Sequence, residues 1–352
     1  VLRWFCDLVG YGSGSGGYLA PGGSIANLTA IVTARHHRLG RKIASGTVYA
    51  SEQTHHSIAK SAIHAGIDPD HVRSVPCDER GRMRDDLFRS MIEADREQGR
   101  MPFLLVSNAG TTNTGAIDDL PAAARLAQEC ALHWHVDAAY GGFFLLTDRG
   151  RRAMPEIARA DSITMDPHKS LFLPYGTGCL LVRDVQRLKA ACDLRGAYMP
   201  RRGEAPDEID ACDLSPEQTR AFRGLRIWLP LKRHGIEAFR EQLDEKLDLT
   251  CDVHERLNEV RRGGLPIVLA DEPQLTVVAF RLQPSGRSAE QADELTDRWL
   301  DAINSHGSIV LSPTRIGERT FLRLCILSFR THRDTIDRAC RIIVESARRL
   351  LS

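Results

Sequence analysis

The chain has 352 residues, 42% of them hydrophobic and 26% charged, and its formal net charge is +1. These proportions predict a globular protein with a large core, and the balanced charge argues against partners such as nucleic acid or an anionic membrane. No apolar run approaches the roughly 18 residues of a membrane-spanning helix. The nine cysteines form no Cys-x-x-Cys pair. We therefore expect no metal site and no disulfide framework, but reduced thiols and a cytoplasmic location. Because the first residue is Val1, we also expect a further segment to precede it.

From the amino terminus to about residue 183, helix-like and strand-like segments alternate. Residues 10–23 contain seven glycines and predict a loop, and the apolar spacing of the next run predicts a helix over 24–38. Further helices are expected at 56–65, at 87–98 and from about 118 to 130. The strand candidates are 46–51, 103–107, 132–137, 162–165 and 178–183. This alternation predicts an α/β fold with a mostly parallel sheet covered by helices.

The pattern changes beyond this point. Residues 195–216 hold three prolines and many charges, which predicts a mobile loop. A helix is expected over 218–248, interrupted near Pro230. The remaining elements are strands at 267–270, 275–282, 308–311 and 321–328, and a final helix from about residue 334. We therefore predict a large domain over residues 1–235 and a small α+β domain over residues 236–352.

Two polar residues follow strand candidates in a way that indicates chemistry. Asp137 ends the run 132–137, and Lys169 follows the run 162–165 within Asp166-Pro167-His168-Lys169. Ligands of such folds bind at the carboxyl ends of parallel strands. An amine that forms an imine, and an acid that keeps a ring nitrogen protonated, are the two groups that pyridoxal phosphate chemistry requires. The alternatives are a helix cap or structural ion pair for Asp137, and a solvated surface charge for Lys169.

Three further segments offer polar groups. Gly22-Gly23-Ser24 precedes a helix, where exposed N–H groups and the helix dipole favour a phosphate; the alternative is a flexible surface loop. His55, beside His56, follows a strand and could lie flat on an aromatic ring, or be merely solvated. The hydroxyl-rich stretch 108–115 could hold a phenolic oxygen or a carboxylate, or form an ordinary turn.

Taken together, these motifs resemble the PLP-dependent group II amino-acid decarboxylases, which include the aromatic-amino-acid, histidine, glutamate and diaminobutyrate decarboxylases. The matching segments keep the order and approximate spacing of that family over nearly the whole chain. They are residues 21–27, 51–57, 109–118, 135–142, 166–169, 220–228 and 321–324. The resemblance implies a PLP-dependent transferase fold of type I (aspartate-aminotransferase-like). It also implies a homodimer that converts an L-amino acid to its amine and CO2 with pyridoxal 5'-phosphate as cofactor.

The resemblance also implies roles for single residues. Lys169 would bind the cofactor covalently, Asp137 would pair with its ring nitrogen, and His55 would stack on the ring and face the reacting carboxylate. Arg323 would hold the substrate carboxylate, with Arg330 as a second candidate. The remaining cofactor contacts would come from Gly23, Ser24, Thr112, Ala139, Asp166 and His168.

Three departures from the family pattern bear on the function. Only 21 residues precede Gly22, whereas the family usually carries a long segment there that lines the substrate pocket and locks two subunits. Where the family usually has Asn before Pro-His-Lys, this chain has Asp166. Residues 199–227 lack the tyrosine that often protonates the carbanion in the family, and Tyr198 is the nearest. The open alternatives are an aldehyde synthase, a carbon–carbon lyase or an aminotransferase on the same fold, and a catalytically silent PLP-binding protein.

Overall fold

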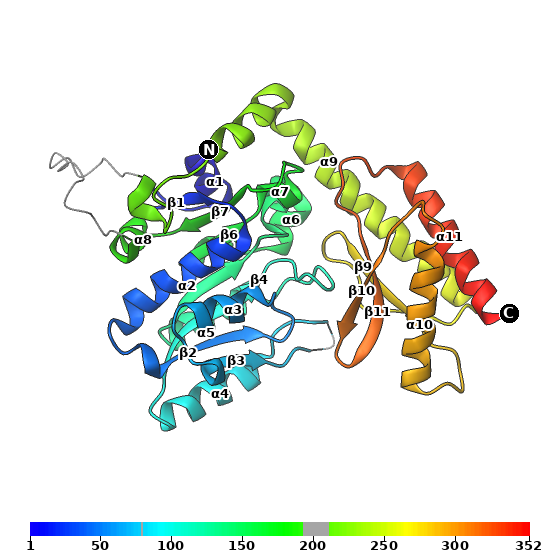
Figure 1. The fold of residues 1–352 in the computed structure, drawn as a ribbon, viewed down its shortest axis with the longest axis horizontal. Coiled ribbons are helices and arrows are strands. Elements are labelled where there is room, and N and C mark those ends of the chain that lie inside the picture. Colours follow the sequence, from blue (N-terminus) through cyan, green and yellow to red (C-terminus); the bar gives the residue numbers. More distant parts are fainter. Residues whose placement is uncertain (79, 193–210) are drawn as a thin grey trace.

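The computed structural model describes residues 1–78, 80–192 and 211–352. Figure 1 shows a larger α/β part and a smaller part, connected along one side by a long helix. The helices up to residue 192 are α1 (Leu2–Val9), α2 (Gly23–Leu39), α3 (Ser57–His64), α4 (Asp85–Glu97), α5 (Leu120–Glu129), α6 (Asp148–Ala153), α7 (Pro167–Ser170) and α8 (Val185–Cys192). The strands are β1 (Gly16–Ala20), β2 (Gly46–Ser51), β3 (Val72–Val75), β4 (Met101–Asn108), β5 (His133–Asp137), β6 (Ser162–Met165) and β7 (Gly178–Val182).

These strands form one sheet in the order β1-β7-β6-β5-β4-β2-β3. The strands β6, β5, β4, β2 and β3 run parallel to one another. At one edge β7 runs antiparallel to β6, and β1 runs antiparallel to β7. Every residue of β5, in the middle of the sheet, is buried. The parallel strands therefore bring their carboxyl ends to one edge, which the alternation of helices and strands predicted.

Alternate residues of each strand pack against helices on opposite faces of the sheet. Val48 of β2 packs with side chains of α2 and α3, whereas its neighbour Tyr49 packs with side chains of α4. On β4, Leu104 likewise packs into the core on the side of α2 and α3, and Leu105 packs into the core on the opposite face. Both faces are covered, so the strands read as continuous apolar runs. α2 crosses β4, β5, β6 and β7, which places its first residue at the carboxyl edge of the sheet.

The glycine-rich stretch is not the continuous loop that was predicted, because it contains β1. Gly17 lies at φ 154°, and a Cβ at this position would meet the Leu180 carbonyl oxygen of β7 at 2.0 Å. Such a close approach of two backbones requires glycine. The glycines that predicted a flexible loop therefore include residues that allow β1 to pair closely with β7.

The second part begins with α9 (Arg223–Arg262), which continues through Pro230 and breaks instead at Gly235, where φ is 76° and ψ is 157°. Glycine adopts this left-handed backbone region without strain, which explains why the kink falls there. Beyond α9, among the described residues, an antiparallel sheet has the order β10-β11-β9-β8 and is covered by helices. Its elements are β8 (Ile267–Leu269), β9 (Val277–Leu282), α10 (Ala289–Asn304), β10 (Ser312–Ile316), β11 (Arg319–Cys325) and α11 (Arg333–Leu351).

Helix α9 contributes side chains to both hydrophobic cores, so the two cores are not separated at a single residue. Phe239, Leu243 and Leu247 pack into the core of the large sheet, whereas residues from Leu249 onward pack into the core of the small sheet. The domain boundary at residues 235 and 236 stays a prediction. Most of the predicted loop 195–216 lies outside the described residues, and residues 211–214 form a 3-10 helix. In the described part of the chain, no helix is long and apolar enough to cross a membrane.

Candidate active site

A pocket of about 560 Å³ lies where the parallel strands of the large sheet end and α2 begins. Asn108 ends β4, Asp137 ends β5, and Asp166 follows β6. The pocket therefore occupies the carboxyl edge of the sheet, where ligands of α/β folds bind. The structure brings together nine of the residues predicted from the sequence: Gly23, Ser24, His55, Thr112, Asp137, Ala139, Asp166, His168 and Lys169 all line it.

Asp137 is a buried carboxylate held by neutral donors. The Asn27 side-chain amide donates to its Oδ2 at 2.9 Å, and the Ala139 N–H donates to its Oδ1 at 3.1 Å. Asn27 is itself oriented, because its Oδ1 lies 3.1 Å from Nε2 of the buried His135. Among the described residues no ion pair includes Asp137. A buried carboxylate without a cationic partner is costly, so this site is suited to a ligand that carries a positive charge.

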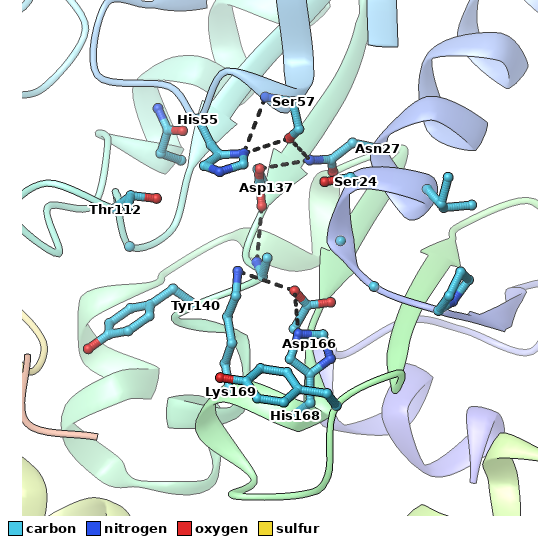
Figure 2. Close-up of a pocket in the computed structure, with 18 of the residues that line it drawn as sticks. Ser24, Asn27, His55, Ser57, Thr112, Asp137, Tyr140, Asp166, His168 and Lys169 are labelled. Atoms are coloured by element: carbon cyan, nitrogen blue, oxygen red, sulfur yellow. Dashed lines mark hydrogen bonds and ion pairs between the residues drawn. The ribbon is translucent and has the colours of Figure 1, made fainter. Parts of the chain in front are cut away.

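Lys169 and Asp166 form an ion pair, with 3.2 Å between Lys169 Nζ and Asp166 Oδ2 (Figure 2). His168 Nε2 lies 3.5 Å from the same oxygen, and its Nδ1 donates to the Thr177 carbonyl oxygen at 2.6 Å. Burial raises the pKa of Asp166, and the charges of Lys169 and His168 partly oppose this shift. The other oxygen, Oδ1, is buried and has no hydrogen-bond partner among the described residues. Asp166 is therefore poised to hold a proton or accept a donor from a ligand.

His55 lies beside Asp137 and is fixed by Ser57 (Figure 2). The Ser57 N–H donates to His55 Nδ1 at 3.2 Å, and the Ser57 hydroxyl lies 2.8 Å from the same nitrogen. Burial lowers the pKa of His55, and the neighbouring His56 and Lys169 lower it further, against the opposing charge of Asp137. The imidazole is thus favoured in its neutral form, with Nδ1 accepting and the proton on Nε2.

The start of α2 forms a tight cradle. A Cβ on Gly23 would lie 2.9 Å from Asp166 Oδ2 and 3.2 Å from the Ala139 Cβ, so only glycine fits there. The N–H groups of Ile25 and Ala26 bond to the Gly22 carbonyl oxygen. In the described structure, no bond from the N–H of Gly23 or Ser24 is found. These two donors and the positive end of a 17-residue helix face the pocket, as an anion site requires.

Several lining residues were not predicted. The sequence offered a signal for Asn27, because this residue lies within the quoted motif 21–27, three residues after Ser24. The structure shows that its amide is buried. Ser57 and Tyr140 also lay within quoted motifs, but their types alone named no role. The Tyr140 hydroxyl contacts Thr276 Oγ1 at 2.5 Å and Cys325 Sγ at 3.4 Å, which links the pocket wall to the small part.

Two predicted substrate residues do not line this pocket. Arg323, on β11, has a buried Nε without a partner among the described residues. Arg330 is exposed and lies over the ring of Phe329. A role for either residue in binding substrate stays a prediction. Tyr198, the tyrosine nearest to residues 199–227, lies outside the described residues.

Comparison with known proteins agrees with this geometry. The pyridoxal-dependent decarboxylase conserved domain matches residues 1–283. The aromatic-L-amino-acid decarboxylase of Bacillus atrophaeus is 33% identical over 333 residues, which is 94% of this chain and 68% of that protein. The cysteine sulfinic acid decarboxylase of Mus musculus is 35% identical over 309 residues, or 85% of this chain and 62% of that protein. The chain thus spans roughly two thirds of the length of these relatives.

Two solved structures have the same fold. The crystal structure of Oryza sativa TDC with PLP and tryptamine superposes with a TM-score of 0.93 at 25% identity and covers 100% of this chain and 75% of that one. Rhodiola rosea 4-hydroxyphenylacetaldehyde synthase has a TM-score of 0.88 at 25% identity, with 100% and 74% covered. The chain belongs to the pyridoxal-dependent decarboxylase family, carboxy-lyases whose cofactor is pyridoxal 5'-phosphate. The family and the type I fold expected from the sequence are confirmed.

The pocket fits this cofactor on grounds independent of the family. Pyridoxal phosphate presents a phosphate, a ring nitrogen that can be protonated and an aldehyde. The cradle of Gly23 and Ser24 offers donors for the phosphate. Asp137 offers a buried anion without a cationic partner among the described residues, and Lys169 offers an amine in the same pocket. Each of these three groups of the cofactor has a matching group in the chain.

Proposed function

We propose that the protein removes the α-carboxylate of an L-amino acid as CO2 and releases the corresponding amine. The observation that carries this proposal is the meeting of three groups in one pocket: the amine of Lys169, the buried carboxylate of Asp137 and the open amino terminus of α2. Residues far apart in the chain supply them, so their meeting is a property of the fold. Membership of the decarboxylase family supports the same reaction.

The roles of the binding residues follow from their contacts. Gly23 and Ser24 would hold the phosphate through their N–H groups, with His168 and Asp166 beside them. Lys169 would hold the cofactor covalently through its amine. Thr112 and Ala139 line the wall next to these groups and would contact the cofactor without bearing charge.

When bound, pyridoxal phosphate accepts the electron pair that remains on Cα as CO2 leaves, and a protonated ring nitrogen makes it a better acceptor. Asp137 would hold that proton. Its two oxygens accept hydrogen bonds from Asn27 and Ala139, which fix the carboxylate in the pocket. Asn27 would position Asp137, because the amide is fixed from its other side by His135.

His55 would orient the substrate. Ser57 keeps Nδ1 as an acceptor, so the neutral ring carries its proton on Nε2 and can donate to the carboxylate of the amino acid. The ring can also lie against the cofactor as a flat surface. The lowered pKa of His55 favours an uncharged imidazole, which can fill both roles without placing a second cation against a protonated cofactor ring.

The central test replaces the amine. Lys169→Ala should abolish the visible absorbance of bound pyridoxal phosphate, together with CO2 release from a panel of amino acids. The panel includes the common protein amino acids, ornithine, diaminobutyrate, dopa and cysteine sulfinate. Lys60→Ala, an exposed lysine on α3, is the matched control and should retain both signals. A Lys169→Ala protein that keeps the band and its turnover would show that the assignment is wrong.

Decarboxylation coupled to oxidative deamination is the second candidate. It is supported by the similarity to the Rhodiola rosea aldehyde synthase and by the absence of tyrosine from residues 199–227. Measuring ammonia and hydrogen peroxide alongside CO2 distinguishes the two. CO2 with amine alone supports simple decarboxylation, whereas equal amounts of CO2, ammonia and hydrogen peroxide, with an equal consumption of O2 as the oxidant, support the aldehyde-forming reaction.

We further propose a homodimer in the cytoplasm, with a large domain over residues 1–235 and a small one over 236–352. The homodimer is supported by the family resemblance, and the domain boundary by the break of α9 at Gly235. Light scattering of the purified protein tests the dimer. Limited proteolysis with cleavage near Gly235 tests the boundary.

A further inference from the structure

A second pocket, of about 410 Å³, lies at the opposite edge of the large sheet. Trp134 and Leu132, at the amino end of β5, form part of its wall. Four arginines line it from separate elements: Arg38 near the end of α2, Arg159 in the 3-10 helix Ile157–Arg159, Arg183 after β7 and Arg187 on α8. Four arginines from distant parts of the chain thus line one hollow, and among the described residues they outnumber the three carboxylates that pair with them.

The acidic groups nearby do not balance these charges. Among the described residues that line this pocket, Asp161 is the one carboxylate. It accepts from Arg183 at 2.6 Å, from Arg187 at 3.4 Å and from the Trp134 N–H at 3.0 Å, so its oxygens are already shared. Glu156, which pairs with Arg159, does not line the pocket, and neither does Asp184, which pairs with Arg187.

Arg38 has donors left over. Its Nη2 donates to the Leu132 carbonyl oxygen at 3.1 Å, and its Nε is buried without a partner. Within the described residues, no carboxylate forms an ion pair with Arg38. A buried guanidinium donor without an acceptor is costly, and a ligand oxygen would satisfy it.

The pKa values of two neighbouring histidines, His37 and His133, are lowered by burial and also by arginines of this pocket. Burial lowers the pKa of His37, and Arg187 and Arg38 lower it further against the opposing charges of Asp161 and Asp184. Burial lowers the pKa of His133 to about 3; Asp161 opposes the shift, whereas His135, Arg38 and Arg187 add to it. Both rings are therefore favoured in their neutral form, and the positive charge near the pocket comes from the arginines.

This pocket is distinct from the candidate active site. Asp137 at the carboxyl end of β5 lines the first pocket and Trp134 near its amino end lines the second. Likewise, α2 contributes Gly23 to the first and Arg38 to the second, which at 1.5 Å per residue places them roughly 22 Å apart along the helix. The fold places one pocket at each end of the same two elements.

We propose that the second pocket binds a small multivalent anion that carries phosphoryl groups. Guanidinium forks match phosphate oxygens in charge and geometry, and several of them in one hollow favour an anion of more than one charge. A volume of about 410 Å³ is sufficient for a small phosphorylated molecule. Ala124, Ala127 and Leu132 give part of the wall an apolar surface for the carbon skeleton of the ligand.

Calorimetric titration of inorganic pyrophosphate tests this site. The protein is first saturated with pyridoxal phosphate, which fills the other phosphate-binding pocket, and cofactor absorbance is recorded throughout. We expect saturable binding of one pyrophosphate per chain with unchanged cofactor absorbance. Arg38→Ala and Arg159→Ala should each weaken the affinity about tenfold, as expected for the loss of one charge-assisted hydrogen bond.

Arg298→Ala, an exposed arginine on α10, is the matched control and should bind pyrophosphate like the wild type. If Arg38→Ala does not fold, Arg159→Ala decides, because the bonds of Arg159 to Glu156 and Gln128 are exposed ones. The proposal is overturned if the titration with pyrophosphate gives no saturable binding heat. It is also overturned if both arginine variants bind like the wild type, or if pyrophosphate binds only by displacing the cofactor. A failure of cofactor binding or turnover would instead contradict the proposed function. The Arg38→Ala and Arg159→Ala variants would still decide where pyrophosphate binds, because neither residue lines the first pocket.

Discussion

The two edges of the large sheet are built from the same elements but carry opposite chemistry. At the carboxyl edge, Asp137 and Asp166 are buried carboxylates, held by amide donors and by Lys169. At the amino edge, arginines surround Asp161, which they share with a backbone N–H. A parallel sheet brings many chain crossings to each edge, so the side chains at strand and helix ends decide what each edge binds.

The largest difference between the edges should appear when a carboxylate is neutralised. Asp137→Asn removes the anion that would hold the ring proton, and turnover should fall about 100- to 1,000-fold. Initial rates of CO2 release, with cofactor occupancy read from absorbance, measure this. The matched substitution Asp248→Asn changes an exposed carboxylate paired with Arg149 and should leave turnover unchanged. A fall of less than tenfold in Asp137→Asn would argue against the role of Asp137.

The strand that joins the edges should make stability depend on pH. Burial lowers the pKa of His133 to about 3 and that of His135 to about 4, below the ordinary value of 6.5. Below about pH 6.5 the unfolded chain therefore binds protons at these two histidines, whereas the folded chain does not. The free energy of unfolding must fall as the pH falls. From pH 7 to pH 5 the loss should be roughly 2 kcal/mol for each histidine.

Urea unfolding at pH 7, 6 and 5 measures this loss in the free energy of unfolding. His135→Asn removes one of the two titrating groups, so its stability should decline less steeply with falling pH than that of the wild type. Equal declines in both proteins would show that His135 does not contribute.

The cradle at the carboxyl edge should be sensitive to a single methyl group. In Gly23→Ala the new Cβ would meet Asp166, which cannot easily move because Lys169 and His168 hold it. Such overpacking costs about 1–3 kcal/mol, so the affinity for pyridoxal phosphate should fall about tenfold or more. Fluorescence titration with the cofactor measures this. Gly12→Ala, where a Cβ would meet nothing within 4 Å, is the control. Unchanged affinity in Gly23→Ala would contradict the cradle.

The smallest effect is expected from the amide that positions Asp137. Asn27→Ala removes one hydrogen bond to a buried charge, so turnover should fall about tenfold. The absorbance maximum of the bound cofactor should also shift, because the carboxylate that would hold its ring nitrogen loses one of its two donors; a purely structural role would leave the maximum in place. Asn258→Ala on α9 serves as the control. An unshifted absorbance maximum would show that Asn27 does not act through Asp137.

Much of the carboxyl edge could be predicted from the sequence because its signals are local. A carboxylate or a lysine directly after an apolar strand, and glycines before a helix, mark the strand and helix ends that meet there. Arg323 is different, because β11 belongs to the small sheet and local pattern could not say how far from the pocket it would lie. β1 was missed because pairing with β7 uses glycines that otherwise indicate a loop.

The sequence by itself determined the alternation of helices and strands, the residues at the strand ends and, through its motifs, the family. Only the tertiary structure decided that Asn27 would fix Asp137, that α9 would break at Gly235 rather than near Pro230, and that four distant arginines would share a hollow. The physical reason is the range of the interactions. Periodicity and capping act between residues close in the chain, whereas hydrogen bonds and charges at an edge depend on which distant elements the sheet order makes neighbours.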